Sequence, residues 1–122
     1  MKQNFETLNV WIKARELSLV CYELTKKFPR EELYGLSDQI RRAAISIPSN
    51  IAEGYSRKSI KDLFHFLDIS TGSIYEIMTQ IDIAMALNII TKNDKSVVFE
   101  KADEVLKLIN GFKKYKRGDN DK

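Results

Sequence analysis

The sequence is poor in the residues that make tight turns, and it is poor in cysteine. Only five glycines and two prolines occur among 122 residues, which disfavours a β fold built on many turns. The single cysteine, Cys21, excludes a disulfide within the chain and suits a reducing compartment. These shortages favour a helical protein of an intracellular compartment.

Long apolar runs are also missing. The longest, such as residues 83–87, are far too short to cross a bilayer. No apolar stretch follows the positive charge of Lys2, as it would in a secretory signal. Hydrophobic residues at 43% and charged residues at 30% are nevertheless typical of a chain that folds. We therefore expect one cytoplasmic domain over residues 1–122, with no membrane segment.

Apolar residues recur with helical spacing in four blocks, which predicts helices at about residues 8–28, 37–54, 60–88 and 93–116. Pro48 lies inside the second block and removes a backbone donor, so we expect a kink or a restarted helix there. Gly54 is expected to cap the end of that block. Short links between amphipathic helices predict an all-α, up-down-up-down four-helix bundle. Its core is expected to include Trp11, Leu67, Ile74 and Ile77.

The third block has more apolar surface than one bundle core needs. Ser59 is expected to cap its start, and a heptad register that begins at Ile60 supplies the core face. Six apolar residues fall outside that register: Phe64, Phe66, Ile69, Met78, Ile83 and Met85. Of these, Phe64, Phe66, Ile69 and Ile83 are the candidates for a subunit interface. Because a four-helix monomer has only one core, we expect a second subunit to cover this excess, giving a homo-oligomer. The alternative is a broad core face covered by long flanking side chains.

A series of short motifs resembles one bacterial family. The motifs are Leu8-x-Val10-Trp11, Phe28-Pro29-x-x-Glu32-x-Tyr34-Gly35-Leu36, Gln39-x-Arg41-Arg42-Ala43-Ala44-x-Ser46-Ile47-Pro48-x-Asn50-Ile51-Ala52-Glu53-Gly54, then Arg57, Ser59, Phe66-Leu67 and Gly72-Ser73-x-x-Glu76. They resemble the four-helix bundle family first described from intervening sequences in bacterial 23S ribosomal RNA genes. The accessory proteins of diversity-generating retroelements are similar. The resemblance covers roughly residues 5–90 and is specific because the motif from Gln39 to Gly54 is long.

This resemblance implies a left-handed up-down-up-down bundle and a ring-shaped homopentamer. It also implies binding to RNA or DNA and, in the retroelement branch, to a reverse transcriptase. No enzymatic activity is attached to the family. Nothing in the sequence places the chain in the retroelement branch.

The motifs also contain residues that are not part of an apolar stripe: Arg41, Arg42, Asn50, Glu53, Gly54 and Glu76. We expect structural pairing or subunit contacts for these residues, because Arg41 adjoins the buried stripe. One such arrangement is an ion pair between Arg41 and Glu76, which must be fully hydrogen-bonded to offset the loss of hydration. The alternative is that the arginines contact phosphates.

Basic residues cluster in two segments, although the net charge is only +3. The turn before the third helix and the end of the fourth supply the expected nucleic-acid contacts: Arg57, Lys58, Lys61, Lys113, Lys114, Lys116 and Arg117. A ring of about five copies would multiply these patches and give a salt-sensitive contact with phosphates. For the last four residues, the alternative is that they only complement the C-terminal helix dipole.

Three patterns in the sequence resemble parts of catalytic sites, but each lacks a residue or a spacing that catalysis requires. Asp62-x-x-His65 is half of a di-iron motif that needs two histidines, and the chain has one. Seven residues separate Arg57 from His65, one too many for the arginine–histidine motif of the HEPN ribonucleases, although an RNA-cleaving bundle stays open as an alternative. Cys21 lies on the core stripe without a catalytic partner. We therefore expect a non-enzymatic nucleic-acid-binding module without cofactor, metal or small-molecule substrate, or alternatively a purely structural oligomer.

Overall fold

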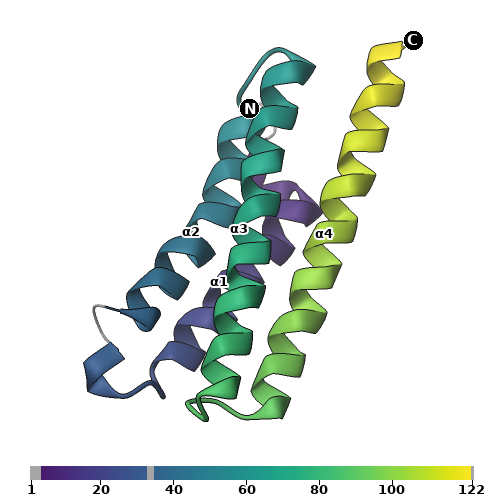
Figure 1. Ribbon diagram of the computed structural model, residues 1–122. Coiled ribbons are helices and arrows are strands. Elements are labelled where there is room, and N and C mark those ends of the chain that lie inside the picture. Colours follow the sequence, from purple (N-terminus) through teal and green to yellow (C-terminus); the bar gives the residue numbers. More distant parts are fainter. Residues whose placement is uncertain (1–3, 33–34, 122) are drawn as a thin grey trace.

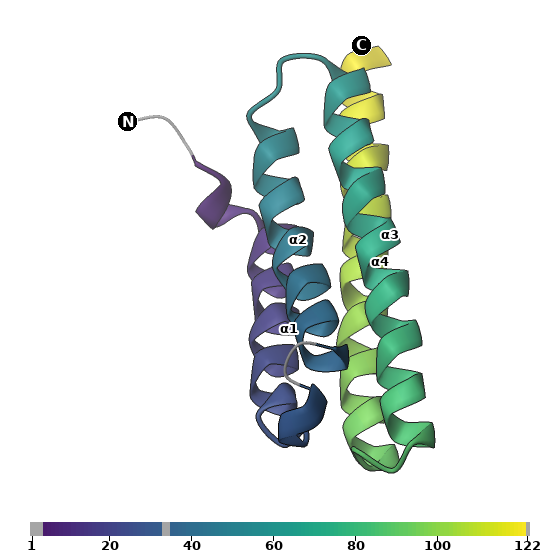
Figure 2. The same cartoon turned by 60° about the vertical axis from the view of Figure 1, so that its left-hand side comes forward.

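The computed structural model describes residues 4–32 and 35–121, and it describes side chains as far as residue 118. All regular secondary structure in these ranges is helical. Tyr34 of the family motif therefore lies outside the described residues. Four helices run side by side: α1 (Asn9–Thr25), α2 (Leu36–Tyr55), α3 (Ile60–Ala86) and α4 (Lys92–Asp121) (Figure 1 and Figure 2). Short 3-10 helices occupy Phe5–Thr7 and Arg30–Glu32.

Consecutive helices run in opposite directions (Figure 1). Helix α4 packs against α1 as well as against α3, so the four helices enclose a single core. The predicted all-α four-helix bundle is confirmed. Within the ranges that the structure describes, no helix is both long enough and apolar enough to cross a membrane.

The buried stripes follow the predicted spacing. Leu67, Ile74 and Ile77 of α3 are fully buried, together with residues of the other three helices such as Leu17, Ile47 and Ile109. Each such side chain contributes about 1.5–3 kcal/mol through its removal from water. Trp11, in contrast, is only partly buried, so its expected place in the core is wrong. Its ring meets Phe5 edge-on, with centroids 5.1 Å apart.

Helix α2 runs without interruption through Pro48, so a restarted helix is wrong. Proline has no N–H to donate to the carbonyl of Ala44, one turn earlier. The hydroxyl of Ser18 on α1 donates to that carbonyl instead, at 2.5 Å. The position is buried, where an unpaired carbonyl would cost about 1–3 kcal/mol. The neighbouring helix therefore supplies the hydrogen bond that the proline removes.

Gly54 packs α2 against α3 and does not cap a helix. Its φ is not positive and α2 continues to Tyr55, so the expected capping role is wrong. A β-carbon at Gly54 would lie 3.0 Å from the β-carbon of Phe66 and 3.2 Å from the carbonyl oxygen of Leu63. Only glycine permits this close approach of the two helices without a shift of the α3 backbone.

We expect Gly54→Ala to lower the free energy of unfolding by about 1–3 kcal/mol, because the added methyl group must displace α3. Gly111→Ala is the matched control, since nothing lies within 4 Å of a β-carbon added there. This control should be neutral or should stabilise the protein by about 0.4–1 kcal/mol. Urea unfolding of both variants, followed by circular dichroism, measures the two changes. Changes of the same sign and size would contradict the close approach.

Helix α3 ends in a Schellman motif. Asn88 takes a left-handed φ of 64°, which asparagine tolerates better than most residues. The N–H groups of Asn88 and Ile89 donate to the carbonyls of Met85 and Ala84, each at 2.9 Å. These bonds satisfy carbonyls that would otherwise be unpaired at the helix end. The helix therefore stops two residues before the predicted limit at residue 88.

A capping box begins α4. The N–H of Asp94 donates to Oγ1 of Thr91, and the N–H of Thr91 donates to the carboxylate of Asp94, both at 3.0 Å. The backbone hydrogen bond from Thr91 lowers the pKa of Asp94. Helix α4 then continues to Asp121, five residues beyond the predicted end at residue 116.

Candidate nucleic-acid interface

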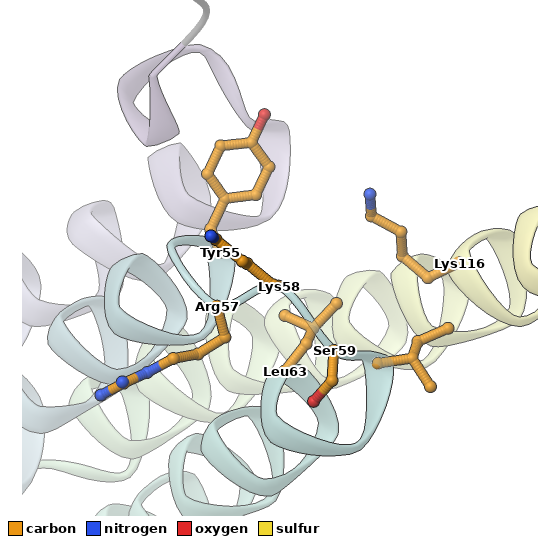
Figure 3. Close-up of a pocket in the computed structure, with 7 residues that line it drawn as sticks. Tyr55, Arg57, Lys58, Ser59, Leu63 and Lys116 are labelled. Atoms are coloured by element: carbon orange, nitrogen blue, oxygen red, sulfur yellow. The ribbon is translucent and has the colours of Figure 1, made fainter.

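The two basic segments predicted to bind nucleic acid meet at one end of the bundle. The turn between α2 and α3 and the last turns of α4 lie at this end (Figure 1). Lys116 of α4 lines the same hollow as Arg57 and Lys58 of the turn (Figure 3). We call this surface the basic end, and it comprises Arg57, Lys58, Lys61, Lys113, Lys114, Lys116 and Arg117.

The basic end concentrates the positive charge of the chain. Residues 53–68 and 113–117 hold seven lysines and arginines against three carboxylates, an excess of four. The net charge of the whole chain is +3, so the remainder is close to neutral. After Gly118, the sequence ends with two acidic residues, Asp119 and Asp121, and one lysine, Lys122, which reduce the excess from four to three. A local excess of this size produces an attractive potential for anions that the net charge alone does not reveal.

Arg57 is engaged within its own chain. Its guanidinium lies 2.6 Å from the carboxylate of Glu53 and 4.9 Å from the centre of the Phe66 ring. It points away from the hollow that Lys58 and Lys116 line (Figure 3). An exposed pair at this helical spacing stabilises a protein by only about 0.3–0.5 kcal/mol. A phosphate can therefore replace Glu53 at small cost.

Two cations of α4 pack on a phenylalanine of α3. Lys113 forms an ion pair with Asp68 and lies 5.4 Å from the centre of the Phe64 ring. Arg117 lies 5.2 Å from the centre of the same ring. These cation–π contacts hold the end of α4 against α3. The two residues thus do more than complement the helix dipole.

Three lysines of the basic end have no partner in the part of the chain that the structure describes. Lys58, Lys61 and Lys114 are exposed and form no ion pair with a described residue. A phosphate that binds them breaks no existing contact. These three residues are therefore the most available cations of the surface.

The four residues predicted at a subunit interface fall into two pairs. Phe64 and Phe66 are partly buried beneath the cations of the basic end. Ile69 and Ile83 are 39% and 44% exposed. Side chains of the same chain therefore cover the two phenylalanines without a second subunit. The two isoleucines remain exposed to solvent.

Arg41 does not pair with Glu76, so that predicted ion pair is wrong. Arg41 faces α1, where its Nε donates to Oγ1 of Thr25 at 2.8 Å and its guanidinium lies 5.0 Å from the centre of the Tyr22 ring. Glu76 accepts a hydrogen bond from Gln80, one turn further along α3, at 3.2 Å. The two residues point to different neighbours because α2 packs between α1 and α3.

The other polar motif residues of α2 make contacts one turn away. Arg42 pairs with Asp38 at 3.0 Å, and its side chain is 79% exposed. The Nδ2 atom of Asn50 donates to the carbonyl of Ser46 at 2.8 Å. These contacts are local to α2 and leave Arg42 largely in solvent.

Tyr55 and Ser59 also line the hollow of the basic end (Figure 3). Ser59 caps α3 as predicted, since its hydroxyl accepts a hydrogen bond from the N–H of Asp62 at 3.1 Å. No motif in the sequence marks Tyr55 as a functional residue. The feature that could have pointed to it is its position two residues before Arg57-Lys58.

The residues with catalytic potential are not arranged as a reactive group. Burial raises the pKa of the Cys21 thiol to about 12, so this side chain stays protonated and packs in the core. His65 is exposed, and it contacts the Phe66 ring that Arg57 also contacts. Glu53 already engages Arg57. Among residues 4–32 and 35–118, no cluster of three or more histidine, cysteine or acidic side chains could hold a metal ion.

The chain is similar to one protein family in sequence and to a solved structure in fold. The sequence profile of a family described as 23S rRNA-intervening sequence protein matches residues 6–111. The chain is also similar in fold to a crystal structure of a protein with unknown function from the S23 ribosomal protein family of Bacteroides thetaiotaomicron. The TM-score is 0.76 at 22% sequence identity, and the match covers 86% of this chain and 98% of that chain. No curated protein matches the chain.

Proposed function

The chain belongs to the 23S rRNA-intervening sequence protein family, and we propose that it is a self-associating, non-enzymatic bundle that binds the phosphate backbone of RNA or DNA. The structural neighbour is described as a protein with unknown function. The proposal therefore rests on the residues of this chain. The observation that carries it is the convergence of Lys58 and Lys116 from separate segments on one hollow.

The state of the cations at the basic end supports the proposed phosphate binding. The unpaired Lys58, Lys61 and Lys114 offer charge to a backbone. Arg57 exchanges one exposed carboxylate for a phosphate. Each phosphate contact releases condensed counterions, so the affinity falls with salt. Contacts with phosphates carry no base identity, so sequence matters little.

Self-association is the second part of the proposal. Ile69 and Ile83 are exposed isoleucines on one helix, and a second copy of the chain would remove them from water. A closed ring would repeat the basic end once per subunit. Phosphates along one strand would then meet several copies at once, which raises the overall affinity.

We expect Ile69→Glu combined with Ile83→Glu to dissociate the oligomer, because each substitution places a charge in the proposed apolar contact. Light scattering on a sizing column should give about five times the 14.1 kDa chain mass for the wild type and a lower mass for the variant. Leu87→Glu is the control, since Leu87 is 60% exposed at the end of α3. A wild-type protein that elutes as a monomer at micromolar concentration contradicts self-association.

Fluorescence anisotropy with labelled RNA and DNA at ~50 mM salt tests the nucleic-acid part, because phosphate contacts are strongest there. Binding of both nucleic acids is expected. The RNA should be intact afterwards on a denaturing gel, whereas cleavage that His65→Ala abolishes would favour the ribonuclease alternative. If the protein binds neither RNA nor DNA, the proposal is contradicted and a protein partner, such as a reverse transcriptase, is favoured.

A further inference from the structure

The hollow at the basic end contains more than cations. It measures about 270 Å³ and is lined by Tyr55, Ile60 and Leu63 in addition to its basic residues. Sites for drug-sized ligands measure about 300–1,000 Å³. The hollow is therefore suited to one ring system and not to a whole cofactor.

Tyr55 is the aromatic side chain of the hollow. It is partly buried, and neither its hydroxyl nor its ring has a partner among the residues that the structure describes. Lys116 lies on the opposite side of the hollow from Tyr55 (Figure 3). An aromatic ring and aliphatic side chains add nothing to a contact with phosphate alone. They do provide a surface on which a flat aromatic ring can stack.

We infer that this hollow receives one unstacked nucleobase of a single strand, with the base on Tyr55 and the flanking phosphates on Lys58 and Lys116. The inference rests on the proposed function and names the form of nucleic acid that the basic end prefers. Aromatic side chains stack with any base because every base has a π-face. Binding of this kind distinguishes single strands from duplexes and is tolerant of sequence.

The polar groups of the hollow support a lack of base selectivity. The hydroxyl of Ser59 already accepts the hydrogen bond that caps α3. The other polar side chains around the hollow, apart from the Tyr55 hydroxyl, are the cations Arg57, Lys58 and Lys116. Lysines donate to phosphates, and the hollow has no carboxylate or amide side chain with which to read the edge of cytosine or adenine. A duplex keeps its bases stacked and cannot fill the hollow without losing a base pair.

Three fluorescent probes of equal length test the inference: a single-stranded oligouridylate, a duplex RNA, and an abasic strand that keeps the phosphates but has no bases. The wild type should bind the oligouridylate at least about fivefold more tightly than the abasic strand, the lower limit for stacking of one base on an aromatic ring. Tyr55→Leu should remove this difference and leave binding to the abasic strand unchanged. Tyr55→Phe should retain it, because the ring is preserved. Tyr75→Leu is the control, since Tyr75 is 56% exposed on α3 and does not line the hollow.

Equal affinity of the wild type for the base-containing and abasic strands, at low salt and with a clear salt dependence, would overturn the inference and leave phosphate binding intact. Loss of oligouridylate and abasic binding together in Tyr55→Leu, with an unchanged circular dichroism melt, would also overturn it. Failure of the wild type to bind any probe would instead overturn the proposed function.

Discussion

Replacing Ile77 with alanine is expected to lower the free energy of unfolding by about 2–5 kcal/mol. Ile77 is fully buried among the core side chains of the bundle. The shorter side chain loses transfer free energy, and the surrounding helices relax only partly into the cavity. Because domains are stable by only about 5–15 kcal/mol, this loss should be plain in a urea titration followed by circular dichroism.

Ile45→Ala is the matched control for this prediction. It removes the same atoms from α2, where the isoleucine side chain is 50% exposed. The expected change is below about 1 kcal/mol, since little apolar surface returns to water. Similar losses in the two variants would show that α3 does not present its heptad register to the core.

The core of α3 could be predicted from the sequence because burial in a helix follows periodicity. Leu67, Ile74 and Ile77 keep the heptad spacing, and all three are fully buried. Trp11 has no comparable support. It belongs to a short motif at the start of α1, and its neighbour in space, Phe5, lies in a 3-10 helix that the pattern did not indicate.

The partners of polar residues could not be predicted in the same way. Arg41 lies on a helix that packs between two others, and nothing in the sequence tells whether it faces α1 or α3. Gly54 illustrates the same difficulty, because a capping glycine and a close-packing glycine look alike in one sequence. The sequence reveals, through Pro48, that the carbonyl of Ala44 has no backbone N–H to accept from. It does not reveal that the hydroxyl of Ser18 donates to this carbonyl, because the two residues meet only in the folded bundle.

The candidate site was partly predictable. Each basic segment is evident in the sequence, and alternating helix directions bring the α2–α3 turn and the end of α4 to one end of the bundle (Figure 2). The engagement of Arg57 by Glu53 and the cover of Phe64 by Lys113 and Arg117 depend on side-chain geometry. Sequence alone therefore overstates the free charge of the surface and the apolar area left for a partner.

Replacing Lys58, Lys61 and Lys116 together with alanine should weaken nucleic-acid binding by at least about tenfold at low salt. Each lost phosphate contact reduces the slope of log affinity against log salt by about 0.9 for duplex DNA and about 0.7 for single strands. The slope should therefore flatten by up to about 2–3 per chain. None of the three lysines forms an ion pair with a described residue. Lys116 lies 5.9 Å from the centre of the Phe112 ring, a surface contact worth about 0.5–1 kcal/mol, so the free energy of unfolding should fall by no more than about 1 kcal/mol.

Lys26, Lys92 and Lys101, replaced together with alanine, provide the charge-matched control. These lysines belong to other parts of the surface, at the end of α1 and in the first half of α4. The control changes the net charge by the same amount, so it separates a local contact from a general loss of positive charge. Its salt slope should remain close to that of the wild type.

The most direct measurement is therefore a salt titration of RNA binding by fluorescence anisotropy for the wild type and these two triple variants. Phosphate binding at the basic end predicts a steep slope for the wild type and the control and a shallow slope for the variant that lacks Lys58, Lys61 and Lys116. Equal slopes in all three folded proteins would contradict the assignment of phosphate binding to this surface.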